Sequence, residues 1–83
     1  MPSSRHGARV LYHEYGAQLR LTTEGRYILN VLCGRVGQFG VEIELNSNEV
    51  LQYREQGDVF IHNLAEDVYD DPKRFRARIL REV

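Results

Sequence analysis

Apolar and polar residues alternate most clearly between residues 39 and 46 of the chain. Because successive side chains of a β-strand point to opposite faces, this alternation predicts a strand with one apolar and one mostly polar face. Residues 26–33 carry a similar pattern, and the glycine-rich segment between the two stretches predicts a turn. The apolar faces of these strands consist of Tyr27, Leu29, Val31 and Cys33 on the first, and Phe39, Val41, Ile43 and Leu45 on the second.

The register of this strand pair follows from the same pattern. Pairing Val31 with Val41 places Leu29 opposite Ile43, so that apolar side chains meet on one face. A slip of one residue would turn the glutamates of the second strand toward the core, which strongly disfavours any other register.

Two further strands are predicted upstream, over residues 9–15 and 18–22. Gly16 and Ala17 are typical of a two-residue turn between them, and residues 23–25 predict a three-residue hairpin loop in which Gly25 takes the left-handed conformation. The four strands then form an antiparallel meander. Its predicted inner face consists of Val10, Tyr12, Leu19, Leu21, Tyr27, Leu29, Val31, Phe39, Val41, Ile43 and Leu45.

The remaining chain predicts helices that cover this face. Asn46 or Ser47 is a suitable N-cap, Glu49 lies in the first turn, and Gly57 ends the first helix. Asp58 is a suitable cap for a second helix over residues 59–69, in which apolar residues recur at a spacing of four. A short fifth strand over residues 59–62 is the alternative, because Val and Ile favour strands.

A third helix is predicted over residues 73–83, with Asp70 or Asp71 as cap and Pro72 at its first position. The expected fold class is α+β: a four-stranded antiparallel β-meander followed by two or three helices packed on one face of the sheet. The 83 residues make a single domain, and residues 1–8 lack periodicity and are expected to form a flexible N-terminal tail.

Composition fits a small folded protein in a reducing compartment. Hydrophobic residues make up 42% of the chain, which is sufficient for a core. The N-terminus lacks the apolar segment of a signal peptide, and no apolar run is long enough to cross a membrane. Cys33 is the only cysteine and lies on the predicted inner face, so we expect a buried thiol and a cytoplasmic protein.

The net charge of −1 conceals an uneven distribution along the chain. Residues 1–41 contain five arginines and two glutamates, residues 42–71 contain one arginine and nine acids, and residues 72–83 contain five basic residues and one glutamate. These segments therefore carry net charges of +3, −8 and +4. They either neutralise one another in the fold or present separate charged surfaces.

No arrangement typical of catalysis or metal binding is present. Gly34, Gly37 and Gly40 lie between two predicted strands rather than before a helix, which favours a turn over a phosphate-binding loop. The histidines and the cysteine lack the spacing of metal ligands, and no serine or cysteine is accompanied by a base and an orienting group. We therefore expect a protein that is not an enzyme and that has no cofactor or metal.

Two functions from different classes remain. An acidic surface made of Glu42, Glu44, Glu66, Asp67 and Asp70 would engage an unidentified protein partner, as regulatory or toxin-neutralising proteins do. Alternatively, the basic C-terminal helix, with Lys73, Arg74, Arg78 and Arg81, would associate with nucleic acid. We favour the protein partner, because the acidic stretch would repel nucleic acid. We expect no membrane association, and the sequence leaves open whether the protein is a monomer or a homodimer.

Overall fold

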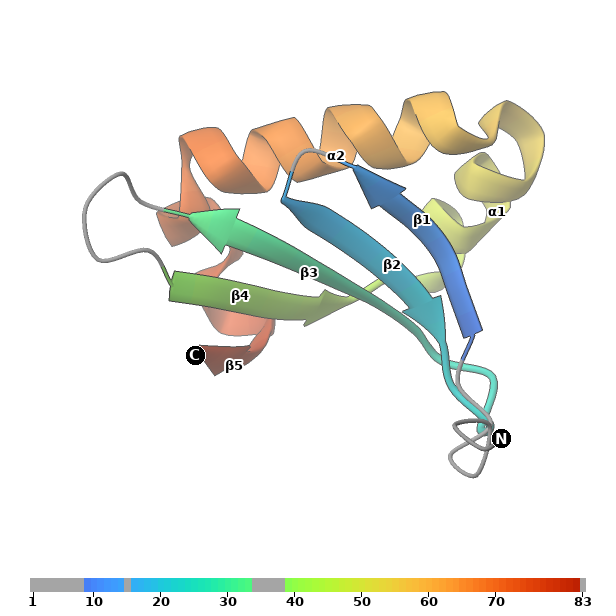
Figure 1. Cartoon of the computed structure of the whole chain (residues 1–83), viewed down its shortest axis with the longest axis horizontal. Coiled ribbons are helices and arrows are strands. Elements are labelled where there is room, and N and C mark those ends of the chain that lie inside the picture. The colour runs from blue at the N-terminus through green and yellow to red at the C-terminus, as the bar shows by residue number, and fades with distance from the viewer. Residues whose placement is uncertain (1–8, 15, 34–38, 83) are drawn as a thin grey trace.

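The fold is an antiparallel sheet with helices packed on one face, as predicted, but the sheet has five strands instead of four (Figure 1). The computed structural model describes residues 9–14, 16–33 and 39–82. The strands follow one another across the sheet in chain order, β1-β2-β3-β4-β5. The elements are β1 (Arg9–Glu14), β2 (Ala17–Leu21), β3 (Tyr27–Cys33), β4 (Phe39–Glu44), α1 (Ser47–Gln56), α2 (Asp58–Asp70), the 3-10 helix η2 (Pro72–Arg78) and β5 (Ile79–Glu82).

The predicted register of the central strands is confirmed. Val31 lies opposite Val41, and Leu29 lies opposite Ile43. In the β2–β3 hairpin, Leu21 pairs with Tyr27, and Gly25 has a φ of +85°, the left-handed conformation expected in this loop. The separation of apolar and charged residues onto two faces therefore sets the register, as the sequence pattern indicates.

One face of the sheet, called here the inner face, carries the hydrophobic core. Its side chains pack against α2, which lies across β3 and β2 (Figure 1). The most deeply buried residues of this core are Leu19, Leu29, Val41, Ile43, Ile61 and Val68. The other face, called the outer face, carries Arg20, Ile28, Asn30, Glu42 and Glu44, which alternate with the core residues along β2, β3 and β4.

The two helices begin and end close to the predicted positions. Asn46 caps α1 through a reciprocal pair of hydrogen bonds with Glu49: the Glu49 N–H donates to the Asn46 side chain, and the Asn46 N–H donates to the Glu49 carboxylate. Gly57 ends α1 with a positive φ. Asp58 is the first residue of α2 and does not cap it with its side chain, contrary to our prediction. Residues 59–62 are helical, so the alternative of a strand there is wrong.

The first strand departs from the prediction at both ends. Val10 was expected on the inner face but is exposed, because the register between β1 and β2 shifts between Val10 and Tyr12. An extra residue at such a β-bulge reverses the faces of the residues before it. Ala17 was expected in the turn, yet it is buried in β2 and pairs with Glu14, while Gly16 has the positive φ that a turn requires.

The largest correction concerns the C-terminal segment. The predicted helix over residues 73–83 is replaced by η2, which ends at Arg78, and by β5, which pairs antiparallel with β4. Phe75 is buried, so part of the apolar pattern serves the core as expected. Beyond it, β5 supplies hydrogen-bonding partners for the edge of β4, which would otherwise expose its backbone. Asp71 precedes η2 without a side-chain capping bond.

Some predictions lie outside the described residues: the flexible tail over residues 1–8, the turn over residues 34–38, and the side chains of Cys33 and Phe39.

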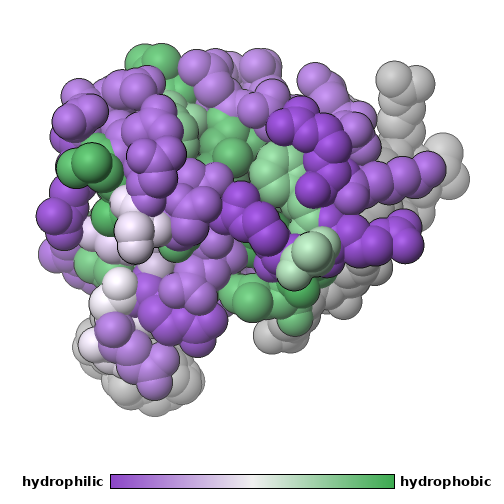
Figure 2. Space-filling view, turned by 180° about the vertical axis from the view of Figure 1, so that it is seen from behind, coloured by the Kyte–Doolittle hydropathy of each residue, from purple (hydrophilic) through white to green (hydrophobic). Residues whose placement is uncertain are grey.

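No helix in the described part of the chain has the length and apolar character needed to cross a lipid bilayer. Seen from behind, hydrophilic side chains cover most of the surface and separate the hydrophobic areas from one another (Figure 2). Among the residues whose burial the structure describes, the exposed large hydrophobic ones are Val10, Leu32, Leu51, Val59, Tyr69 and Leu80.

Candidate functional site: an acidic groove between α2 and β1

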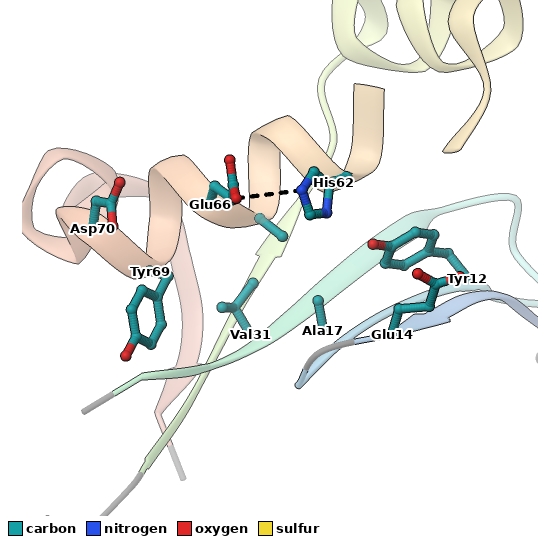
Figure 3. Close-up of a pocket in the computed structure, with 9 residues that line it drawn as sticks. Tyr12, Glu14, Ala17, Val31, His62, Glu66, Tyr69 and Asp70 are labelled. Carbon is teal, nitrogen blue, oxygen red and sulfur yellow. Dashed lines mark ion pairs between the residues drawn. The ribbon is translucent and has the colours of Figure 1, made fainter. Parts of the chain in front are cut away.

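A hollow in the described structure lies on the inner face, between α2 and the adjoining ends of β1, β2 and β3 (Figure 3). Its volume is about 650 Å³, which is within the range of ligand-binding sites in proteins. It exists because α2 packs against β3 and β2 and leaves space beside β1. We call it the acidic groove; it is lined by Tyr12, Glu14, Ala17, Val31, His62, Ala65, Glu66, Tyr69 and Asp70.

The floor of the acidic groove is apolar. Ala17 and Val31 come from neighbouring positions of β2 and β3, which are paired in the sheet, and Ala65 faces them from α2. Two tyrosines stand at the sides: Tyr12 is almost entirely buried, whereas Tyr69 is 46% exposed and extends from α2 toward the sheet (Figure 3). Because the two alanine side chains are small, they do not fill the space between the helix and the sheet.

Three carboxylates line the acidic groove. Glu14 comes from the end of β1, and Glu66 and Asp70 come from α2, where a spacing of four residues places them on the same side of the helix. His62 lies one turn before Glu66, and its Nε2 is 3.3 Å from a carboxylate oxygen of Glu66. This contact is an ion pair only when His62 is protonated. No lysine or arginine is among the described residues that line the groove.

The glutamates of the outer face, in contrast, have arginine partners. Nη1 of Arg20 lies 3.2 Å from Oε2 of Glu42, and the same oxygen accepts a hydrogen bond from the Asn30 side chain. Arg26 donates two hydrogen bonds to Glu44, from Nε at 3.1 Å and from Nη2 at 2.9 Å. This bonding lowers the pKa of Glu44 and raises the pKa of Arg26. Glu14 and Asp70 form no ion pair with any residue in the described ranges.

The structure divides the predicted acidic surface between two regions. Glu66 and Asp70 lie together in the acidic groove, and Asp67 is exposed on α2 beside them. Glu42 and Glu44 lie on the outer face of β4, where their carboxylates are occupied by arginines. The residues available to a partner are therefore the helical ones, to which the structure adds Glu14.

The predicted basic surface is also divided. Lys73 and Arg74 are exposed on η2, and the Arg74 guanidinium lies 5.4 Å from the centre of the Phe75 ring. Arg78 instead bonds within the fold: it donates to both carboxylate oxygens of Glu49 and to the backbone carbonyl of Glu44. Bonding to Glu49 raises the pKa of Arg78. Nucleic-acid binding by this segment stays a prediction, with one of its four residues committed to holding the fold.

Arg81 is the fourth of those basic residues. It lies in β5, opposite Glu42 in the register with β4, and so does not belong to a helix with Lys73 and Arg74. The Arg78–Glu49 ion pair shows that the C-terminal segment neutralises part of the acidic stretch within the fold. The groove lies outside this neutralised part.

Sequence reasoning missed the contribution of Glu14, Tyr12 and Tyr69 to the groove. The recurrence of His62, Glu66 and Asp70 at intervals of four was a usable signal for the helical side. The β1 side of the groove had no such signal in the sequence, because no local pattern reveals which strand end faces a helix.

His62 pairs with Glu66, one turn further along α2. No group of three or more His, Cys, Asp and Glu side chains within the described ranges is arranged to hold a metal ion.

Comparisons of the chain with protein-family models, with curated proteins and with solved structures found no match.

Proposed function

We propose that this is a small non-enzymatic binding protein that engages a protein partner through the acidic groove. The observation that supports the proposal is the set of three carboxylates in the groove with no arginine or lysine beside them in the described structure. Carboxylates elsewhere in the fold, such as Glu42, Glu44 and Glu49, stabilise it through arginine partners. Exposed carboxylates without an arginine or lysine beside them are available to a cationic partner.

A protein with a basic segment is the partner that this chemistry favours. Negative potential in a concave site attracts a positively charged partner and speeds its association. The apolar floor and the two tyrosines provide the desolvated contact area that charges alone do not supply. Regulatory and toxin-neutralising proteins are the classes we favour, acting in the cytoplasm.

The test compares partner capture by three forms of the purified protein, immobilised at equal density. The groove variant carries Glu66→Lys and Asp70→Lys. The control variant carries Glu24→Lys and Glu55→Lys, which make the same change in net charge at exposed positions that do not line the groove. Circular dichroism and urea melts confirm that both variants fold.

We expect a protein from the native host to be retained by the wild type and by the control variant and to be lost from the groove variant. Raising the salt concentration should weaken this retention, because screening acts over roughly 8–10 Å at physiological ionic strength. Equal retention by all three forms, or retention of nucleic acid alone, contradicts the proposal.

A further inference from the structure

The acidic groove has the chemistry of a receptor for one particular side chain. Resting on the function proposed above, we infer that the groove takes an arginine side chain presented by the partner. The groove combines a strip of apolar floor, aromatic side chains and carboxylates at its rim (Figure 3). An arginine side chain combines an apolar stem with a planar cationic head, so each part has a counterpart in the groove.

The stem fits the floor. Ala17, Val31 and Ala65 line the groove and form an apolar floor between the tyrosines. Methylene groups that pack against this apolar floor lose contact with water, which is favourable. A small anion or a purely polar ligand would leave the floor unused, and a purely apolar ligand would bury the carboxylates without a partner.

The guanidinium fits the rim. Glu66 and Asp70 line the groove from α2 and Glu14 lines it from the end of β1, so both elements offer carboxylates to a cationic head. A guanidinium has five N–H donors in a plane and can donate hydrogen bonds to two carboxylates at once, whereas an ammonium is a point charge. Tyr69 is 46% exposed and extends toward the sheet, and a guanidinium stacks on an aromatic face of this kind. Arginine is therefore favoured over lysine.

The partner main chain is not expected to extend the sheet beside the groove. Within the described residues β1 is an edge strand, since only β2 pairs with it. Its bulge between Val10 and Tyr12 interrupts the regular pattern of backbone donors and acceptors that an added strand needs. Recognition therefore rests on the inserted side chain, which makes short peptides suitable probes.

The test is an NMR titration of the isotopically labelled full chain at low salt with four peptides of the form Ac-Gly-Ser-Xaa-Ser-Gly-NH2. Xaa is arginine, lysine, citrulline or norleucine. Citrulline has nearly the shape of arginine without its charge, and norleucine has an apolar stem without a head. The methyl signals of Ala17, Val31 and Ala65 report on the floor of the groove, and those of residues remote from it serve as reference.

We expect the arginine peptide to shift the groove methyl signals with saturation. Loss of the charge-assisted hydrogen bonds should weaken the citrulline peptide by roughly tenfold or more. Loss of the planar fork should weaken the lysine peptide by about threefold. Citrulline or lysine binding as tightly as arginine, shifts confined to sites outside the groove, or no binding by the arginine peptide would overturn the inference.

A variant pair guards against effects on folding. Glu66→Gln with Asp70→Asn keeps the shapes of two exposed side chains and removes their charges, and should weaken the arginine peptide by roughly tenfold. Glu24→Gln with Glu55→Gln removes the same charge elsewhere and should leave binding within about twofold, because exposed charges at a distance are largely screened. Equal losses in both variants would contradict binding in the groove.

The outcome also separates this inference from the proposed function. If the captured partner depends on Glu66 and Asp70 while the arginine peptide fails to bind, the groove engages a protein by other contacts, and only the inference falls. If the arginine peptide binds in the groove but no protein is lost from the groove variant, the proposed function falls. The two experiments use different ligands, so one result does not imply the other.

Discussion

The two faces of the sheet handle charge in opposite ways. On the outer face, Glu42 and Glu44 of β4 pair with Arg20 of β2 and with Arg26 of the β2–β3 hairpin loop, and the charges cancel in pairs. On the inner face, the acidic groove gathers Glu14, Glu66 and Asp70 without an arginine or lysine from the described residues. Both sets of acids belong to the same small protein, so acidic composition by itself does not identify a binding surface. The two sets differ in whether an arginine of the fold lies beside the carboxylates.

The two faces of the sheet also differ in how they bury isoleucine side chains. Ile43 lies on the inner face and is fully buried in the core, while Ile28 lies on the outer face and is 4% exposed. Ile28 pairs across the sheet with Arg20 and Glu44, and the aliphatic parts of such long side chains can cover an apolar neighbour. The long side chains of the outer face can therefore also shield a hydrophobic residue that lies outside the core cluster.

The largest expected effect separates these two isoleucines. Ile43→Ala should lower the free energy of unfolding by about 3–5 kcal/mol, because the cavity it leaves is enclosed by core residues. Ile28→Ala should cost nearer 2 kcal/mol, at the low end of the range for buried isoleucines, since flexible side chains can close over the space. Urea denaturation of both variants measures the difference. Equal losses would show that the outer face packs as tightly as the core.

A smaller effect should separate acids that have partners from acids that do not. Glu42→Gln removes the Arg20 ion pair at a side chain only 12% exposed, and should cost about 1 kcal/mol. Glu14→Gln should change stability by less than about 0.5 kcal/mol in either direction, as is usual for surface substitutions. The same denaturation experiment at neutral pH compares them. A larger loss at Glu14 would reveal a structural partner for this carboxylate and would weaken the proposed role of the groove.

The smallest effect concerns pH. Because bonding to Arg26 lowers the pKa of Glu44 in the folded protein, the unfolded chain binds a proton more readily at this position. The pair therefore stabilises the fold above about pH 4.3, the ordinary value for glutamate, and this contribution disappears as the pH falls further. Denaturation midpoints between pH 2.5 and pH 7 should decline less steeply at the acid end for Glu44→Gln than for the wild type. Glu55→Gln, at an exposed site on α1, should follow the wild type.

The fold could be predicted from the sequence wherever one local pattern determined the outcome. Alternation in β3 and β4 set their register, and Asn46 with Glu49 set the start of α1. The C-terminal segment was mispredicted because Phe75 and Ile79 have a helical spacing, while the need of β4 for a strand partner is not visible in the local sequence. Tertiary context overrides propensity in such segments.

The candidate site was predicted only in part for a similar reason. Glu66 and Asp70 stood out because they lie in an acidic stretch of one helix. Glu14 lies far from them in the sequence, and the groove depends on where α2 crosses the sheet, which is set by core packing among residues such as Leu29 and Ile61. The sequence also did not reveal that Glu42 and Glu44 are occupied by arginines.

The bonds from Arg78 to Glu49 and to the carbonyl of Glu44 have a consequence for the order of folding. Strands β1 to β4 are joined by short hairpins, so their contacts are local and can form early. β5 must instead close a long loop onto β4, and the closure is stabilised by a short strand, by the buried Phe75 of η2 and by this arginine. The C-terminal segment is thus the part of the sheet that we expect to dock last and to open first in sub-global fluctuations. Since Glu49 also completes the cap of α1, each such opening would loosen the beginning of that helix as well.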